Sequence, residues 1–392
     1  MTETGHPALL PEGLHDVLPP DAAHEAAQVE RLMAMFSAWG YERIKPPLIE
    51  FEDSLLAGAG AAMAGQTFRL LDPVSQRMLA VRADTTLQAA RIATTRLIHE
   101  PRPLRLAYAG QVLRVKGGQL RRERQFGQVG VELIGPLDSS ADAEVIVLGA
   151  HALTQLGVNG ISVDLCVPTL VPALCRSLAL SEEDLRRLRL ALDRKDAAAV
   201  MSVGGPAAET LARLLAASGP APQALAALAD LTLEGEAAAD RQRLTEVVGL
   251  IGTAAKHLAP DLKVTVDLVE YRGFEYQSGL SFTFFARDVR GELGVGGRYR
   301  AGCGGAGGDP RGEPGTGFTF YTDTVLRAVP GPRPQQRLYI PQACPPERAA
   351  QARADGWTTV AGLRVVEDET AEARRLRCRQ RLGPDGPVAV PN

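Results

Sequence analysis

Two strand-like segments separated by a short polar loop constrain the fold of this chain more than any other feature. They span residues 108–113 and 127–134, and this arrangement predicts an antiparallel hairpin. Further strand candidates lie at residues 264–269, 280–286 and 316–321. Because helical segments occur between the strands, the pattern predicts an α+β fold in which helices pack on a mainly antiparallel sheet.

A helix is predicted near the start of the chain. Residues 22–38 place apolar side chains at the spacing of one helical face, namely Val29, Leu32, Met33 and Phe36. The helix ends at Gly40, and residues 41–44 read as a strand that leads into two prolines. An ordinary packed helix and an interface helix fit this periodicity equally well.

The middle of the chain has a different composition. Residues 181–260 are rich in Ala, Leu, Arg and Glu, and leucines recur there at helical spacing. Ser181, followed by three acidic residues, is a good helix start because its hydroxyl can cap free amides and the acids oppose the helix dipole. We therefore expect a helical insertion at 181–260, within a core formed by residues 1–180 and 261–330.

The end of the chain predicts a separate small α/β domain at residues 331–392. Its expected elements alternate in type: strand 338–340, helix 346–354, strand 357–360, helix 370–379 and a short strand near Val388.

Composition narrows the class of protein. The net charge of −3 gives no general attraction to nucleic acid, and 45% hydrophobic content is ordinary for a globular protein. No apolar run is long enough for a membrane span, and the first twenty residues lack a basic start followed by an apolar stretch, so the expected compartment is the cytoplasm.

The cysteines and the glycine-rich segment predict no cofactor or metal site. The five cysteines are widely spaced, without a C-x-x-C pair, and read as reduced thiols. Residues 300–317 are glycine-dense and could suggest a phosphate cradle, but they lack the GK[ST] ending of a P-loop. A mobile loop is favoured.

Several short segments occur in a fixed order: 11–19 (PEGLHDVLP), 81–86 (VRADTT), 108–135, 272–279 (RGFEYQSG) and 296–300 (GGRYR). Together they resemble the histidyl-tRNA synthetases, over about residues 8 to 330. The resemblance implies the class II synthetase fold, with a helical insertion and a shortened form of the anticodon-binding domain at the end. It also implies a homodimer formed through the first helix and the strand that follows it.

Free histidine presents an ammonium, a carboxylate and an imidazole, so a selective site needs acidic, cationic and acceptor groups. By family position, Asp84, Thr86 and Gln128 would hold the ammonium, while Arg114 and Arg272 would approach the carboxylate. The imidazole end and the pocket wall are implied to come from Glu132, Tyr276 and Tyr299. Each of these residues taken singly has an ordinary alternative, such as a turn acid, a surface charge or a structural ion pair.

The chain departs from the synthetases where ATP chemistry requires charge. Lys116 stands where the family has a glutamate, Thr324 replaces an arginine that clamps the γ-phosphate, and Asp323 replaces a glutamate. Tyr321 replaces the glycine beside the adenine. Loss of one preorganised electrostatic contact costs about 3–4 kcal/mol of transition-state stabilisation. We therefore expect no amino-acid-activating enzyme. Gln277 also departs, from a tyrosine that many synthetases place against the ring.

These departures make the chain resemble the regulatory subunits of ATP phosphoribosyltransferase. The resemblance implies a non-catalytic chain that activates a short-form catalytic subunit in a hetero-oligomer and senses L-histidine for feedback on the first step of histidine biosynthesis, without binding tRNA. The alternatives are a histidine-tRNA ligase-like enzyme with an atypical ATP site, or a scaffold that does not bind histidine.

A basic cluster in the hairpin loop has two readings. It comprises Lys116, Arg121, Arg122 and Arg124. It could meet an anionic nucleotide or an acidic face of a partner, but a solvated hairpin tip explains it equally well. No aromatic residue is interleaved for base stacking, which argues against nucleic-acid binding there.

Overall fold

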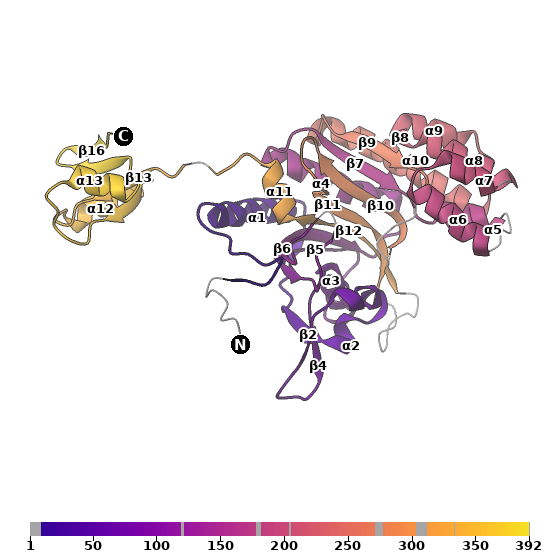
Figure 1. The fold of residues 1–392 in the computed structure, drawn as a ribbon, viewed down its shortest axis with the longest axis horizontal. Coiled ribbons are helices and arrows are strands. Elements are labelled where there is room, and N and C mark those ends of the chain that lie inside the picture. The colour runs from indigo at the N-terminus through magenta and orange to yellow at the C-terminus, as the bar shows by residue number, and fades with distance from the viewer. Residues whose placement is uncertain are drawn as a thin grey trace, which may run out of the picture. The chain divides into compact units, whose positions relative to one another are not determined.

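The computed structural model describes residues 9–118, 121–177, 182–203, 205–270, 277–302, 312–332 and 334–391. The chain divides into two compact units, Met1–Gly331 and Pro332–Asn392. Figure 1 shows the elements of both. None of the described helices combines the length and the apolar character that a membrane span requires.

A nine-stranded sheet forms the centre of the first unit, in the order β1-β5-β6-β12-β11-β10-β7-β9-β8. The β1–β5 and β7–β9 pairs are parallel and all other neighbours are antiparallel, which confirms the predicted fold class. The strands are β1 Glu42–Arg43, β5 Leu104–Leu113, β6 Gln125–Ile134, β7 Ile161–Cys166, β8 Gly219–Pro220, β9 Lys263–Asp267, β10 Gln277–Ala286, β11 Gly294–Ala301 and β12 Glu313–Tyr321.

Strand alternation assigns β6 side chains to two different environments. Successive side chains of a strand point to opposite faces. Val129, Val131 and Leu133 join the main hydrophobic core, which also contains Phe36 of α1 (Asp21–Ala38) and the apolar side of α4 (Ser139–Leu156). Gln128 and Glu132, at the intervening positions, are therefore directed to the opposite face, near α3 (Thr86–Thr95).

A small sheet precedes α3. It has the order β2-β4-β3, with β2 Ile49–Phe51, β3 Arg69–Leu71 and β4 Met78–Val81. The helix α2 (Glu52–Leu55) and the 3₁₀ helix η1 (Gly58–Gln66) lie between β2 and β3 in the chain. Several large apolar side chains of this region are exposed: Leu48, Ile49, Phe51, Leu70, Leu71 and Met78.

The helices that lie between β7 and β9 in the chain gather beyond the end of the large sheet that is formed by β7, β9 and β8 (Figure 1). The long helix α10 packs against α4 and so connects this group to the core. The predicted cap Ser181 lies outside the described residues. The helices are α5 Leu170–Ser177, α6 Glu182–Asp193, α7 Ala197–Val203, α8 Gly205–Ala217, α9 Ala221–Ala229 and α10 Gly235–Leu258.

The glycine-rich segment differs in part from the predicted loop. β11 runs to Ala301 and β12 begins at Glu313, and α11 (Thr322–Ala328) follows β12 directly. Gly315 and Gly317 are thus strand residues, because β12 is paired with β6 on one side and β11 on the other. Residues 303–311 lie outside the described part.

The second unit holds a four-stranded sheet in the order β14-β13-β15-β16. The second helix ends at Arg375 rather than at the predicted residue 379, and β15, which was not predicted, follows it. Arg377 has a φ of 57°, a left-handed conformation that ends the helix. The elements are β13 Arg337–Ile340, α12 Pro346–Ala354, β14 Thr358–Ala361, α13 Glu369–Arg375, β15 Gln380–Gly383 and β16 Gly386–Ala389.

Candidate functional site

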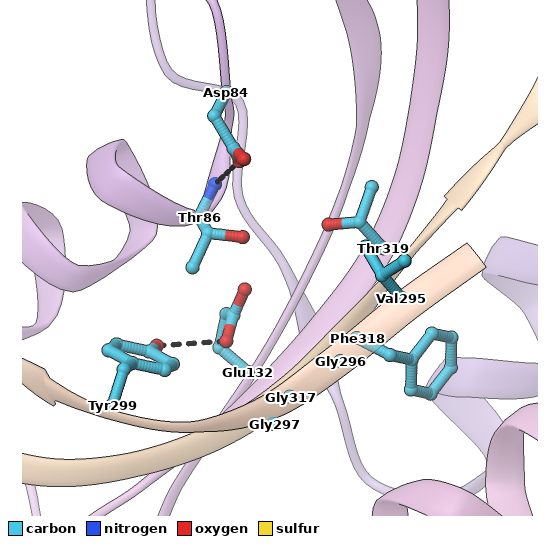
Figure 2. Close-up of a pocket in the computed structure, with 10 residues that line it drawn as sticks. All are labelled: Asp84, Thr86, Glu132, Val295, Gly296, Gly297, Tyr299, Gly317, Phe318 and Thr319. Carbon is cyan, nitrogen blue, oxygen red and sulfur yellow. Dashed lines mark hydrogen bonds between the residues drawn. The ribbon is translucent and has the colours of Figure 1, made fainter. Parts of the chain in front are cut away.

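A small cavity with a volume of about 20 Å³ lies between the start of α3 and the middle of the large sheet. Its polar lining comes from Asp84, Thr86, Glu132, Tyr299 and Thr319 (Figure 2). The rest of the lining is apolar or glycine: Val295, Gly296, Gly297, Gly317 and Phe318. A cavity of this volume holds about one water molecule.

The carboxyl group of Glu132 accepts a hydrogen bond at each of its two oxygens. Tyr299 donates a hydrogen bond of 2.8 Å to Oε2, drawn in Figure 2, and Tyr108 donates one of 3.1 Å to Oε1. Glu132 is 1% exposed. Burial raises its pKa to about 8, although the hydrogen bond from Tyr299 acts in the opposite direction. The cavity therefore contains an acid that titrates near neutral pH.

Asp84 supplies a second buried acid. It lies between β4 and α3, and its Oδ1 accepts a hydrogen bond of 2.9 Å from the backbone N–H of Thr86. Burial raises the pKa of Asp84, while the positive charge of Arg114 opposes the rise. Two carboxyl groups with raised pKa values in one cavity favour a ligand that brings positive charge or N–H donors.

Gln128 is fully buried beside these acids. Its Oε1 accepts a hydrogen bond of 2.9 Å from the backbone N–H of Thr85. Its Nε2 is buried and makes no well-formed hydrogen bond in the described part of the chain, although the Gln128 amide lowers the pKa of Asp84. The polar atom left over is thus a donor, which suits an acceptor rather than the ammonium group.

The remaining predicted residues either do not line the cavity or lie outside the described part of the chain. Arg114 does not line the cavity: its Nε donates to the carbonyl of Ala83 at 3.3 Å, and its guanidinium lies 5.1 Å from the ring centroid of Phe126. Arg272 and Tyr276 lie outside the described residues. The structure thus brings together Asp84, Thr86, Gln128, Glu132 and Tyr299 from three segments of the chain: the start of α3, β6 and β11.

Sequence reasoning did not identify Tyr108 or Thr319, whose hydroxyl groups lie 2.5 Å apart beside Glu132. The available signal was glycine in a predicted strand, which often marks a close approach of another group. Gly130 is paired with Tyr108, and a Cβ at Gly130 would overlap the Tyr108 hydroxyl. A Cβ at Gly317 would likewise overlap Oε2 of Glu132.

The side of the site where the resemblance places the nucleotide is filled by the chain's own side chains. Arg121 is 9% exposed and its guanidinium lies 3.8 Å from the ring centroid of Tyr321 and 4.8 Å from that of Phe126. It donates to Asp323 at 3.0 Å and to Thr324 at 2.9 Å. Burial raises the pKa of Tyr321 to about 12, so the ring is neutral.

This arrangement corrects the reading of the basic cluster. Arg121 is neither part of a solvated tip nor directed at an external anion, because Asp323 and Glu292 neutralise it within the fold. Lys116 and Arg122 are exposed, as a solvated tip requires. Arg124 donates to the carbonyl of Glu12 at 3.2 Å and so attaches the N-terminal segment to the hairpin.

Comparison with known proteins places the chain in a family. The family model described as histidyl-tRNA synthetase matches residues 13–325. The ATP phosphoribosyltransferase regulatory subunit of Rhodospirillum centenum is 61% identical over 371 residues, which cover 95% of this chain and 93% of that protein.

Two solved structures share the fold. One, an ATP phosphoribosyltransferase regulatory subunit/histidyl-tRNA synthetase from Bacillus halodurans C, is 26% identical with a TM-score of 0.77, over 93% of this chain and 96% of that chain. The other is a chain of the ATP phosphoribosyl transferase (HisG:HisZ) complex from Thermotoga maritima, with 17% identity, a TM-score of 0.57 and coverage of 76% and 97%. The 61% identity to the Rhodospirillum protein and the family model confirm the expected family: the chain belongs to the ATP phosphoribosyltransferase regulatory subunits, which share the histidyl-tRNA synthetase fold.

Proposed function

We propose that this chain binds a short-form ATP phosphoribosyltransferase catalytic subunit, activates it, and senses L-histidine for feedback control. One observation carries the proposal. The two parts of the site that resembles the synthetases differ, because Arg121 and Tyr321 fill the region where the resemblance places the nucleotide, while a polar cavity lies where it places histidine. A chain with a ligand cavity and no room for ATP is useful when occupancy of the cavity changes the activity of another protein.

The filled side argues against chemistry on this chain. Adenylation depends on fixed positive charge around the triphosphate. Arg121 brings a positive charge to this region, but Asp323 and Glu292 already neutralise it. Thr324, at the position of the γ-phosphate arginine, is 1% exposed and bonded to Arg121. The family name of the relatives and the fold shared with the Thermotoga complex support a separate catalytic partner.

In the proposed complex with histidine, Glu132 accepts the imidazole N–H and Asp84 receives the ammonium together with Thr86. Gln128 donates its Nε2–H to the carboxylate of the ligand, which revises the role assigned to it from the sequence. Arg114 and Arg272 remain the cationic candidates at that end. Tyr276 and Tyr299 remain candidates for the pocket wall.

Histidine binding requires the cavity to enlarge, since about 20 Å³ holds only one water molecule. Tyr299 also lines a second hollow of about 290 Å³ that lies against α10. A rotation of the Tyr299 ring, which breaks its hydrogen bond to Glu132, would connect the two spaces. The same movement supplies a conformational signal that the partner can read.

The proposed assembly also includes a homodimer and a cytoplasmic location. The exposed apolar side chains around β2, β3 and β4 follow the first helix and strand in the chain, and a second copy would cover them. No role is proposed for tRNA, because the net charge of −3 and the short second unit of Pro332–Asn392 do not favour it.

Reconstitution with a short-form catalytic subunit tests the proposal. We expect the mixture to be more active than the catalytic subunit alone, and histidine to inhibit it. Allosteric coupling of this kind is typically worth about 1–3 kcal/mol. Glu132→Ala should weaken the inhibition, while Arg187→Ala, at an exposed surface pair on α6, should not. Equal inhibition of wild type and Glu132→Ala would place the sensor on the partner or at the interface.

A further inference from the structure

The hydroxyl of Tyr108 lies at the centre of a buried hydrogen-bond network. It is within 3.1 Å of Glu132 Oε1, 3.0 Å of Thr86 Oγ1 and 2.5 Å of Thr319 Oγ1. Tyr108 is 0% exposed, and it is not among the residues that line the cavity. It can therefore affect a ligand only through the groups that it holds.

The donor count fixes the direction of these hydrogen bonds when Glu132 is ionised. A carboxylate only accepts, so the single proton of the Tyr108 hydroxyl is used on Glu132. Its oxygen then accepts from the hydroxyl of Thr319, while the hydroxyl of Thr86 can donate to Tyr108 or to Glu132 itself. Each hydroxyl of the network then donates one hydrogen bond. The donated protons all point toward the Glu132 carboxylate, either directly or through the Tyr108 hydroxyl.

The backbone leaves space for this network. Gly130 faces the Tyr108 hydroxyl and Gly317 faces the Glu132 carboxyl, and a Cβ at either position would overlap those atoms. Tyr108, Glu132 and Thr319 lie on β5, β6 and β12, which are neighbours in the sheet. These three residues therefore come from a rigid part of the fold. A rigid support of this kind gives the acceptor oxygen a defined direction.

We propose that Tyr108 is the positioning residue of this site: it holds Glu132 as an acceptor and thereby makes the cavity select a ligand ring that carries an N–H donor. The proposal rests on the proposed histidine-binding function and adds the group that sets its specificity. Tyr299 donates to the other oxygen of the same carboxyl but lines the cavity, so it can move away when a ligand enters. Tyr108 stays and continues to orient the carboxylate.

Selectivity for the ring N–H can be measured with an analogue that lacks it. In 2-thiazolylalanine, the five-membered ring has a bare nitrogen and a sulfur and no N–H. Calorimetry on the full chain should show histidine binding at least about tenfold more tightly than this analogue, since a site that accepts a hydrogen bond rejects a ligand that cannot donate. In Tyr108→Phe, most of that preference should disappear.

A matched control is available in the same unit. Tyr41 is 2% exposed and its hydroxyl also donates to a carboxylate, Glu144, at 3.0 Å. Glu144 does not line the cavity. Tyr41→Phe removes the same atom from a similar environment and should leave the preference for histidine unchanged. An unchanged preference in Tyr108→Phe would overturn the proposal.

A second measurement does not need a ligand. The ¹³C-carboxyl titration of Glu132 reports its environment directly, and the titratable groups that face it in the described chain are Tyr108, Tyr299 and Asp84. Loss of a donor to the charged form should raise the midpoint in Tyr108→Phe by about one pH unit. Tyr41→Phe should not shift it. An identical midpoint in Tyr108→Phe and wild type would overturn the positioning role.

These outcomes separate the two proposals. If wild type binds no histidine but the Glu132 midpoint moves in Tyr108→Phe, the histidine-sensing function fails and the positioning of Glu132 stands. If wild type binds histidine and Tyr108→Phe matches it in both measurements, the histidine-sensing function stands and the positioning role of Tyr108 fails.

Should Tyr108→Phe fail to fold, Thr319→Val serves instead, because it removes a hydroxyl that orients Tyr108 while keeping the side-chain shape. It should shift both readouts in the same direction, by a smaller amount, and no shift would count against the proposal.

Discussion

The guanidinium of Arg121 lies 3.8 Å from the ring centroid of Tyr321, and both side chains are buried. They come from the hairpin loop and from the end of β12, the two regions that resemble the ATP-binding motifs of the synthetases. A cation and an aromatic ring of the chain itself therefore fill the region where the resemblance places the nucleotide. This packing also fixes the hairpin loop against α11 through Asp323 and Thr324.

The purified chain should not catalyse histidine-dependent exchange of pyrophosphate with ATP. Thr324→Arg alone should not create this activity, because Tyr321 and Arg121 still fill the nucleotide side and Lys116 keeps the reversed charge. A radiolabelled exchange assay at saturating ATP checks both variants. Exchange clearly above background in wild type would contradict the assignment of a non-catalytic chain, and exchange only in Thr324→Arg would show that Tyr321 and Arg121 do not block the nucleotide side.

Arg121→Ala should destabilise the first unit by about 1–3 kcal/mol, because it leaves carboxylates without their partner. This cost is below the about 3–5 kcal/mol for breaking a fully buried pair, because Asp323 and Glu292 are 19% and 21% exposed. Urea unfolding measures the difference. Arg187→Ala, which breaks the exposed pair with Asp184 on α6, is the control and should change the free energy of unfolding by less than about 1 kcal/mol.

Stability should fall as the pH rises from about 4.5 to 8. The pKa of Glu132 is raised by burial from 4.5 to about 8, so the folded state holds a proton that the unfolded state has lost. Its stabilising contribution is complete below the unfolded pKa and is lost as pH rises through the folded one, with a slope of at most about 1.4 kcal/mol per pH unit. Asp84 acts in the same direction. Glu132→Gln should flatten the curve, and an equally steep curve in that variant would disprove the assignment.

The buried ion pair between Arg298 and Asp142 should be the most sensitive charge pair of the first unit. Their side chains are 4% and 1% exposed, and Arg298 Nε donates to Asp142 Oδ2 at 2.8 Å. Asp142→Ala leaves a buried cation without its counter-charge, with only the carbonyls of Pro136 and Asp138 as acceptors, and should cost about 3–5 kcal/mol of folding free energy. Asp142→Asn keeps an oxygen acceptor and should cost less. Thermal or urea unfolding of both variants checks the order.

The local pattern of apolar and polar residues was sufficient to predict where many of the helices and strands lie. The spacing of apolar residues located α1 to within one residue at its start, and the strand–loop–strand pattern located the β5–β6 hairpin. The predicted limits of the helices and strands in the second unit were less accurate. β15 was missed, because no periodicity of apolar residues indicates the left-handed turn at Arg377 that ends α13. The predicted glycine loop was too long, since pairing on both sides extends β12 into it.

The sequence by itself determined the family and the cavity acids Asp84 and Glu132, because these residues occur within short motifs whose order along the chain is visible. Only the tertiary structure decided which side chains surround them. Arg121 reaches Thr324 across 203 residues and Tyr108 reaches Thr319 across 211. Such contacts depend on the register of β5, β6 and β12, and burial in that register also raises the pKa of Glu132. No local pattern encodes a hydrogen bond that exists only when three strands are paired.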